Sequence, residues 1–442
     1  MEAYVKGTGN PEPSIRPFYE EILLKVHQHS LESPSRAAFF VVSMEDYANH
    51  ANQLPIYNFQ DILKTDPNLI GPLPKVDINK DTAILPSSSG TTGLPKMVKL
   101  SHKNLTSLLH TYTWYGKNML YPHLDAQFDP TQECFLHFLP HYHMFGFSML
   151  LIALAHGFTG ILMERYQPEL LLQCVKHLHI VPPVALYLAK SPLVNKKYDL
   201  SSLRSIYVGA AALGPKLATD LKERLNLKSV TQGYGCTEAT LSFFRPTYKD
   251  DPPLSSGKLQ GHMEAKLSRF IADIETGKTL KVNKVGELCV KGELVMLGYL
   301  NNEKATREVL SQDGWVRTGD IGYLNSDGYL FIVDRLKELI RVSGRQVAPN
   351  EIEDILQSHP KISDAAVVGV PDNKYGEVPR AFVVKKDASL NEREIHDLLK
   401  DRLSSYKQLR GGIYFVNEIT KSPSGKILRR KMREQVVTNS KL

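Results

Sequence analysis

Cysteine is scarce in this sequence. The 442 residues include only four cysteines, and none of them forms a Cys-x-x-Cys pair: Cys134, Cys174, Cys236 and Cys289. The missing pairs argue against a structural zinc site, and the wide spacing argues against the disulfide framework of a small secreted protein. We therefore expect the chain to work in a reducing compartment.

Long hydrophobic runs are also missing. The most apolar stretch, FGFSMLLIALAHGF (residues 145–158), is shorter than the roughly 20 residues of a membrane-spanning helix, so it predicts a buried helix or strand. The first residues, MEAYVKGTGNPEPSIRP, contain no apolar core and do not form a signal peptide. We therefore expect no membrane span.

The excess of positive charge is small. The net charge is +7. Part of it lies near the C-terminus, where seven basic residues face only Glu434: Lys421, Lys426, Arg429, Arg430, Lys431, Arg433 and Lys441. A basic tail can bind nucleic acid, but zinc-finger spacing, ribonucleoprotein aromatics and a clear recognition helix are missing. We therefore favour a solvated surface and an anionic small-molecule ligand.

The last three residues match a targeting signal. Ser440-Lys441-Leu442 matches the peroxisomal import tripeptide, which a receptor reads at a free C-terminus. We expect the import receptor to be a partner and the peroxisomal matrix to be the location.

The order of hydrophobic patterns predicts an α/β fold with two domains. From Thr82 to Leu213, short apolar strands such as CFLHFLP alternate with helical stretches, including a helix from His102 and the run LLLQCVKHLHI, which is typical of a layered domain with mainly parallel sheets. Helical and strand-like patterns also occur earlier, at EEILLKVHQ and AAFFVVS. From about Gly257, short strands predict a small β-rich subdomain, with a hairpin turn at Asp327-Gly328.

A domain boundary is expected near Lys337. Residues 1–336 would form the large domain, and residues 337–442 a small, mobile α+β domain that ends in the targeting tripeptide. In the small domain, NEIEDIL predicts a helix, and DAAVVGV and RAFVV predict strands. NEREIHDLLKDRL predicts an amphipathic helix that Asn391 and Glu394 begin.

One loop predicts a phosphate site. In SSSGTTGLPKMVKLSH (residues 87–102), two glycines allow backbone amides to turn toward an anion, while hydroxyls and one lysine add donors and charge: Ser87, Ser88, Ser89, Gly90, Thr91, Thr92, Gly93 and Lys96. The spacing is not that of a Walker loop. A flexible Gly/Pro loop is the alternative, but it does not explain five hydroxyls leading into a lysine, so we favour phosphate binding.

Five stretches together resemble the acyl-adenylate-forming (AMP-binding) enzymes, in the branch of acyl-CoA synthetases, coumarate–CoA ligases and luciferases. They occur in the family's order: SSSGTTGLPK with LSHKNL, QGYGCTEA at 232–239, WVRTGDIGYLNSDGYLFIVDRLKELI at 315–340, SGRQVAPNEIE at 343–353 and KSPSGKILRR at 421–430. The resemblance implies an ATP-dependent acid–thiol ligase that forms acyl-AMP and then acyl-CoA. It implies ATP, Mg²⁺ and coenzyme A as ligands, and with the targeting tripeptide it favours a fatty or aryl-aliphatic acid.

The resemblance also assigns nucleotide-binding roles. It implies that Asp320 accepts the ribose hydroxyls, that Tyr234 offers its ring to adenine and that Glu238 binds Mg²⁺. Other residues of the same motifs are expected around AMP: Gly209, Ala210, Ala211, Gln232, Gly233, Gly235, Thr237 and Arg335. Simpler interpretations stay open, namely a turn aspartate at 320, a core tyrosine at 234, a surface glutamate at 238, and an arginine that pairs with Asp334.

Lys426 is the sharpest catalytic candidate. In the family the equivalent lysine crosses from the small domain and bridges the carboxylate and the α-phosphate, which would relieve the repulsion between two anions. An exposed basic residue is the alternative. His143, in LPHYHMFG, matches a residue near the acyl pocket and the CoA tunnel and is expected to shape the pocket, with a satisfied core histidine as the alternative.

The hinge and the second half-reaction have their own candidates. Lys337 is expected to be the hinge, and Ser343, Gly344 and Gln346 are expected in the loop that serves the thioester step. Arg341 stands where close relatives often carry lysine, and it keeps the charge but changes the geometry of donors. We therefore expect adenylation to survive this change and any effect to fall on the thioester step.

The sequence departs from the family ahead of the phosphate loop. Gly90 lies early in the chain compared with the family, so we expect a large domain that is shortened at its N-terminus, which bears on stability more than on chemistry. Two other functions therefore stay open: a nucleotide-binding pseudoenzyme without turnover, and a luciferase-like oxygenase that acts on its own adenylate. A nucleic-acid binder is more remote.

Overall fold

The structure is a computed structural model. It describes residues 4–6, 75–88, 95–125, 127–163, 168–171, 177–194, 198, 200, 201, 203–249, 251–268, 280–422 and 426–433. Several predicted features lie outside the described residues: the helix over residues 20–28, the strand over residues 37–43, residues 89–93 of the phosphate loop, Cys174 and the C-terminal tripeptide.

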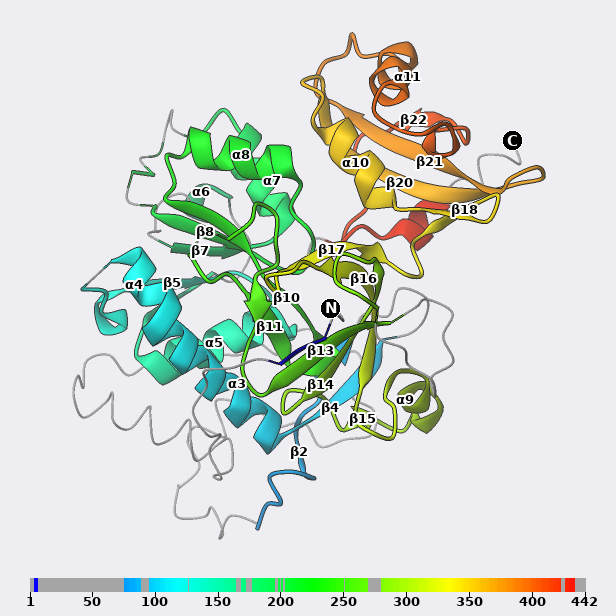
Figure 1. Ribbon diagram of the computed structural model, residues 1–442. Coiled ribbons are helices and arrows are strands. Elements are labelled where there is room, and N and C mark those ends of the chain that lie inside the picture. Colours follow the sequence, from blue (N-terminus) through cyan, green and yellow to red (C-terminus); the bar gives the residue numbers. More distant parts are fainter. Residues whose placement is uncertain are drawn as a thin grey trace, which may run out of the picture.

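The first half of the large domain has the predicted α/β architecture (Figure 1). Its parallel strands are β5 (Cys134–His137) with β6 (Thr159–Leu162), and β7 (His177–Ile180) with β8 (Ser205–Val208) and β9 (Ser229–Gln232). Helices α7 (Pro182–Lys190) and α8 (Pro215–Arg224) bury leucines against the alternate residues of these strands. This packing is the layered core predicted from the alternating pattern.

Two long helices follow the phosphate-loop strands and β5. Helix α3 (His102–Tyr115) begins where predicted, because the Ser101 hydroxyl accepts a hydrogen bond from Asn104 N while Asn104 accepts one from Ser101 N. The apolar run forms α5 (Met144–His156), which ends at Gly157 in the left-handed conformation. Within the described part of the chain, no helix is both long enough and apolar enough to span a membrane.

One predicted helix was wrong in part. In LLLQCVKHLHI, α6 (Pro168–Leu171) is helical, but the last four residues form strand β7. Those four residues alternate His, Leu, His, Ile, which is the two-residue period of a strand. Leu178 and Ile180 of this strand are buried in the core beneath α7 and α8.

The remaining sheets of the large domain are antiparallel, so "mainly parallel" holds only for β5–β9. A five-stranded sheet has the order β1-β13-β14-β16-β17, and two smaller sheets contain β10-β11-β12 and β15-β4-β2, with β3 beside β4. Their bounds are β1 (Tyr4–Lys6), β2 (Thr82–Ile84), β3 (Ser87–Ser88), β4 (Lys96–Ser101), β10 (Tyr234–Cys236), β11 (Leu241–Arg245), β12 (Lys258–Leu259), β13 (Met263–Ser268), β14 (Gly286–Gly292), β15 (Gly298–Tyr299), β16 (Val316–Leu324) and β17 (Leu330–Arg335). The predicted hairpin joins β16 to β17 through Gly328 at φ 80°.

The small domain has one sheet that is buried on both faces. The sheet order is β19-β18-β21-β20, with β22 parallel to β21. Val367 of β20 packs beneath the helices, while its neighbour Val368 packs against Met432 on the opposite face. The elements are β18 (Ile340–Val342), β19 (Arg345–Val347), α10 (Pro349–Gln357), β20 (Ile362–Asp372), β21 (Gly376–Lys385), α11 (Glu392–Lys400) and β22 (Ile413–Phe415).

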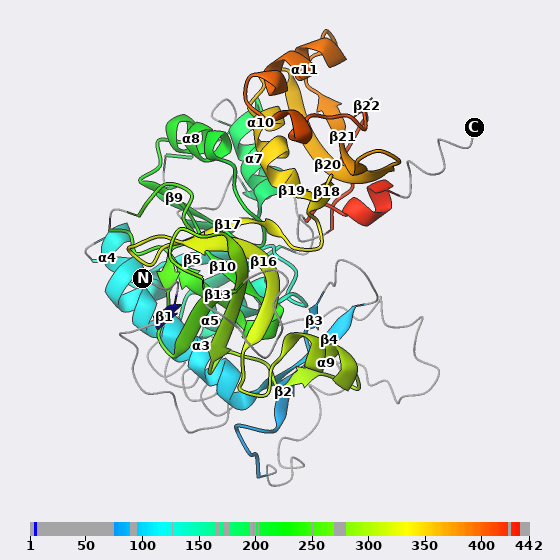
Figure 2. The same cartoon turned by 45° about the vertical axis from the view of Figure 1, so that its right-hand side comes forward.

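The two parts meet beside β16 and β17. In both views the small domain lies over the end of the large domain where these strands and helix α7 are found (Figures 1 and 2). Strand β17 ends at Arg335 and β18 begins at Ile340, so the predicted boundary near Lys337 falls in the short connection between them. The exact boundary and the mobility of the small domain stay predictions.

Candidate functional site

Asp320 stands at the centre of the candidate site. Its side chain is only 8% exposed, and both of its carboxylate oxygens have partners. Tyr234 OH donates to Oδ2 over 2.6 Å, and Arg335 Nε lies 3.1 Å from Oδ1. Strands β16 and β17 set this geometry, because Asp320 and Arg335 are paired across the ladder. Each oxygen keeps a second lone pair for a ribose hydroxyl.

The structure distinguishes the alternatives for Arg335 and Tyr234. The guanidinium of Arg335 pairs with Asp320, whereas only its backbone N–H donates to Asp334 Oδ1, over 2.7 Å. The Asp320 charge raises the pKa of Arg335. Tyr234 packs edge-on against Phe243, as a core tyrosine would, but it also binds Asp320; burial, and then that carboxylate, raise the pKa of the phenol. Its role toward adenine stays a prediction.

Glu238 joins the phosphate-loop strand to the site. Its Oε1 accepts hydrogen bonds from Ser88 Oγ over 2.6 Å and from Tyr299 OH over 2.9 Å. Lys96 Nζ lies 4.7 Å from the centroid of the Tyr299 ring, so the loop lysine is beside the same group. Tyr299 was missed from the sequence, because nothing near GYLNN signals a contact with Glu238. Burial and the Glu238 charge raise the pKa of Tyr299.

Lys426 enters the site from the small domain. Its backbone is held to Ser422 by two hydrogen bonds, in which Lys426 N donates to Ser422 Oγ and Ser422 N donates to Lys426 O. Burial lowers the pKa of Lys426, and the nearby charge of Arg335 lowers it further, whereas Asp320 and Glu238 act in the opposite direction. These four charged side chains therefore lie close enough to act on one another.

His143 lies close enough to Lys426 to feel its charge. It precedes α5 in an extended conformation, and its ring centroid is 4.6 Å from that of the exposed Tyr142. Burial lowers the pKa of His143, and the charge of Lys426 lowers it further. Its role in shaping the acyl pocket stays a prediction.

The glycines that directly follow β8 and β9 make room for aromatic side chains. A Cβ atom on Gly209 would lie 2.9 Å from the ring of Phe145, and one on Gly233 would lie 1.8 Å from Tyr207 OH. Ala210 and Ala211 are exposed, and Ala210 has a φ of 71°, an uncommon conformation for a residue with a side chain.

The other predicted residues of QGYGCTEA have different positions. Gln232 accepts a hydrogen bond from Leu213 N and donates one to Leu254 O, so its side chain braces two loops. Gly235 is exposed within β10, and Thr237 begins the short helix Thr237–Ala239 that carries Glu238. For Gln232, the structure therefore indicates support of the site; direct nucleotide contact stays a prediction.

The thioester-loop candidates point to solvent. Ser343 and Gly344 form the turn between β18 and β19 with φ values of 48° and 76°, and Arg341, Ser343, Gly344 and Gln346 are all exposed. Arg341 N donates to Glu377 Oε2 over 2.8 Å within the small domain. The orientation that brings Lys426 to Asp320 thus leaves this loop outside the site.

A buried charge cluster beside the hinge was missed from the sequence. Arg429, which was expected on a solvated tail, is 8% exposed. It donates to Glu338 over 2.6 Å, to Glu353 over 2.8 Å and 2.9 Å, and to Asn350 over 3.0 Å. The expectation of a solvated tail was therefore wrong for Arg429, because the carboxylates that bury it lie 76 and 91 positions away along the chain.

Asp334, which accepts hydrogen bonds from Arg335 N and Asn350 N, should make stability depend on pH. Burial raises its pKa from 3.8 to about 7, against the charge of Arg429. Between these two pH values the folded chain holds a proton on Asp334 that the unfolded chain has lost. The contribution of this proton to the free energy of unfolding is complete below pH 3.8 and is lost as the pH rises through 7. Asp334→Asn should remove this dependence, which is on the order of a few kcal/mol. Urea unfolding at several pH values checks it, with exposed Asp327→Asn as control; identical pH profiles for wild type and Asp334→Asn would contradict it.

The chain belongs to the AMP-binding enzyme family. Residues 28–300 match the model of the AMP-binding enzyme, and residues 351–426 match that of the AMP-binding enzyme C-terminal domain. The first match covers more than half of the chain. It includes the phosphate loop, Glu238, and Tyr234, which is hydrogen-bonded to Asp320. The family resemblance inferred from the five stretches is confirmed.

Curated relatives include two kinds of enzyme. A probable 4-coumarate–CoA ligase 3 of Dictyostelium discoideum is 44% identical over 371 residues, which are 82% of this chain and 65% of that protein. The luciferin 4-monooxygenase of Photinus pyralis is 40% identical over 372 residues, with 83% and 65% covered. The chain thus spans less than two thirds of the length of these relatives.

Solved structures share the fold. The anthranilate CoA ligase AuaEII in complex with anthranoyl-AMP superposes with a TM-score of 0.71 at 28% identity, covering 82% of this chain and 68% of that one. ATP-bound MatB from Rhodopseudomonas palustris gives a TM-score of 0.71 at 27% identity, with 81% and 68% covered. The α/β architecture with a separate C-terminal domain is that of these enzymes.

Proposed function

We propose that the protein is an ATP-dependent carboxylate–CoA ligase, which forms an acyl-adenylate and then an acyl-CoA. The observation that carries the proposal is the convergence of Lys426 from the small domain with Asp320, Arg335 and Glu238 from the large domain. A cation in this position supplies the positive charge that a carboxylate needs when it approaches a phosphate. The names of similar proteins, 4-coumarate–CoA ligases and an anthranilate CoA ligase, support the same reaction.

In the first step a carboxylate oxygen attacks the α-phosphorus of ATP. A bond forms between that oxygen and the α-phosphorus, the bond from the α-phosphorus to the oxygen bridging it to the β-phosphate breaks, and pyrophosphate leaves with the electron pair. Asp320 orients the ribose, and the ammonium of Lys426 offsets the repulsion between the two anions as they approach. Burial around Lys426 strengthens this effect because solvent screening is reduced.

Glu238 fits a magnesium role. Mg²⁺ keeps several waters and typically takes only one or two protein carboxylates besides substrate phosphates, and Glu238 lies beside Ser88 of the phosphate loop. Among the residues that the structure describes, no cluster of three or more possible ligands could hold a metal by itself. When bound with ATP, the ion would neutralise phosphate charge.

Glu238→Gln should raise the Mg²⁺ concentration needed for half-maximal activity at least about tenfold, because the charge is lost while an oxygen remains for Ser88 and Tyr299. A Mg²⁺ titration of pyrophosphate release measures it, with exposed Glu303→Gln as the matched control. An unchanged Mg²⁺ requirement would exclude Glu238 as a ligand.

In the second step the CoA thiolate attacks the acyl carbonyl and AMP leaves. The candidates Ser343, Gly344, Gln346 and Arg341 are exposed in the present orientation, so we propose that the small domain turns about Lys337 to bring them to the site. Arg341 then supplies the positive charge that lysine supplies in close relatives.

We propose a fatty or aryl-aliphatic acid as substrate and the peroxisomal matrix as location. Relatives named as 4-coumarate–CoA ligases support an aryl-aliphatic acid, and Ser440-Lys441-Leu442 supports import through the peroxisomal receptor. Imaging of the chain with a fluorescent protein at its N-terminus tests the location. Loss of punctate peroxisomal signal on removal of the last three residues is expected, and a diffuse signal from the full chain would contradict it.

The experiment that tests the reaction is pyrophosphate release from ATP and Mg²⁺ with a panel of acids, from acetate through long-chain fatty acids to cinnamates, with and without CoA. Release that needs one acid class, and acyl-CoA formation when CoA is present, are expected. ATP binding without release for any acid would support the pseudoenzyme. Oxygen uptake or light from the adenylate would support the second candidate, a luciferase-like oxygenase, which the similarity to luciferin 4-monooxygenase favours.

A further inference from the structure

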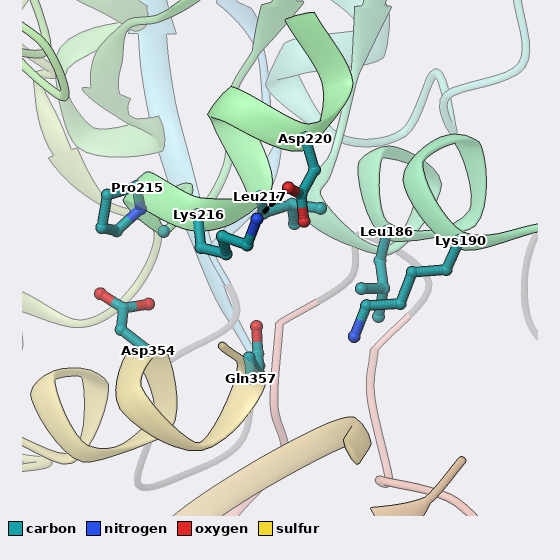
Figure 3. A pocket seen from close by; sticks show the side chains of 9 residues that line it. Leu186, Lys190, Pro215, Lys216, Leu217, Asp220, Asp354 and Gln357 are labelled. Atoms are coloured by element: carbon teal, nitrogen blue, oxygen red, sulfur yellow. Dashed lines mark hydrogen bonds and ion pairs between the residues drawn. The ribbon is translucent and has the colours of Figure 1, made fainter. Parts of the chain in front are cut away.

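Lys190 makes a contact between the two domains and is far from Asp320 and Lys426 in the sequence. It is the last residue of α7 in the large domain, and its Nζ donates to Ile362 O over 2.9 Å and to Ser363 O over 3.3 Å. Both carbonyls belong to the start of β20 in the small domain. Figure 3 shows the side chain extending from α7 toward the small domain. An ammonium that binds two backbone carbonyls holds this edge of the sheet in place.

A second contact lies beside it, between α8 and α10. A Cβ atom on Gly214 would lie only 2.6 Å from Asp354 Oδ1, so the small domain approaches closely because residue 214 has no side chain. The cavity left between Lys190, Asp354 and the start of α8 is about 20 Å³, the room for a single water molecule (Figure 3). The domains are therefore closely docked here.

We propose that Lys190 is a positioning residue for adenylate formation, which together with the Gly214–Asp354 contact holds the small domain in the orientation that presents Lys426. The proposal rests on the proposed function. Lys190 touches neither Asp320 nor the phosphate loop in the described hydrogen bonds, so it acts through the domain orientation and not on the reacting atoms. Because the thioester step needs the exposed loop around Gly344 at the site, the same contacts must break before CoA reacts.

The substitution Lys190→Met should separate the two half-reactions. It keeps a long apolar stem but removes the donor to both carbonyls, so the docked orientation becomes less populated and acid-dependent ATP–pyrophosphate exchange should fall about tenfold. Thioester formation from supplied acyl-adenylate and CoA should be unchanged or faster. Lys190→Arg, which keeps a charged donor, should restore much of the exchange, and exposed Lys222→Met on α8 is the control.

Gly214→Ala provides a second, independent test. Residue 214 has φ −64° and ψ 150°, a conformation open to alanine, so the large domain should fold normally while the new methyl group pushes against Asp354. Acid-dependent ATP–pyrophosphate exchange should fall in Gly214→Ala as it does in Lys190→Met. Adding Asp354→Ala removes the obstructing carboxylate, so the double variant should recover part of the lost exchange.

Hydrogen exchange reads the orientation without using activity. In Lys190→Met, peptides that contain Lys426 or the start of β20 should exchange several-fold faster, while peptides of β8 keep their protection. An equal loss of both half-reactions in Lys190→Met would overturn the proposal. Hydrogen-exchange rates equal to those of wild type would also overturn it. If wild type shows no acid-dependent pyrophosphate exchange, the proposed function fails, and the hydrogen-exchange comparison still decides whether Lys190 holds the domains together.

Discussion

Lys426→Ala should abolish most adenylate formation, lowering acid-dependent pyrophosphate release by about 10²- to 10³-fold, the range for loss of one charged group that stabilises a transition state. The side chain is buried among the charges of Arg335, Asp320 and Glu238. The thioester step, started from supplied acyl-adenylate, should change far less. Single-turnover rates of both half-reactions measure the contrast.

Lys431→Ala is the matched control, because Lys431 is exposed on the following helical turn. A second signature is the pH profile. Burial lowers the pKa of Lys426 from 10.5, the usual value for lysine. The adenylation rate should therefore begin to fall at a pH below 10.5, and Lys426→Arg should move this alkaline fall to higher pH. Equal losses in both half-reactions would assign Lys426 to folding or docking and not to adenylation.

Asp320→Asn should raise the KM for ATP at least about tenfold and lower kcat/KM about 10²-fold. The change keeps the size of the side chain but removes its negative charge. That charge pairs with Arg335, and the carboxylate that carries it accepts a hydrogen bond from Tyr234 OH. It should also cost about 1–3 kcal/mol of stability, because the partners lose a buried charged acceptor. Initial-rate kinetics against ATP concentration, with thermal unfolding in parallel, separate the two effects.

Tyr234→Phe measures how much the hydrogen bond from Tyr234 contributes to the role of Asp320. It removes one hydrogen bond to the carboxylate and keeps the ring against Phe243, so the KM for ATP should rise only a few-fold. Exposed Asp327→Asn should leave kinetics unchanged. An Asp320→Asn variant with the wild-type KM for ATP would remove Asp320 from nucleotide binding.

Local patterns were sufficient for many elements. Ser101 and Asn104 begin α3 through a capping box, and Asp327-Gly328 turns the β16–β17 hairpin, because both signals act over four residues or fewer. The apolar run of α5 was ambiguous between helix and strand, since it is apolar on every side. Period two in HLHI indicated β7, and it was overlooked beside the longer apolar run.

The site itself could be predicted only through the family resemblance. Ser88 and Glu238, which share a hydrogen bond, are 150 positions apart, and no local pattern predicts such a pair. The same limit explains why Tyr299, the buried Arg429 and the interdomain contact of Lys190 were missed. A basic residue in a basic segment looks exposed until the fold supplies its carboxylates.

The central claim is that a carboxylate oxygen attacks the α-phosphorus of ATP in this site. Its most direct test uses the acid found active in the panel, labelled with ¹⁸O in its carboxylate, together with ATP, Mg²⁺ and CoA, and mass spectrometry of the products. The proposed reaction transfers one ¹⁸O into the phosphate of AMP, and Lys426→Ala should slow the formation of labelled AMP about 10²- to 10³-fold. Label in inorganic phosphate, or AMP that forms without ¹⁸O while acyl-CoA accumulates, would contradict an acyl-adenylate intermediate.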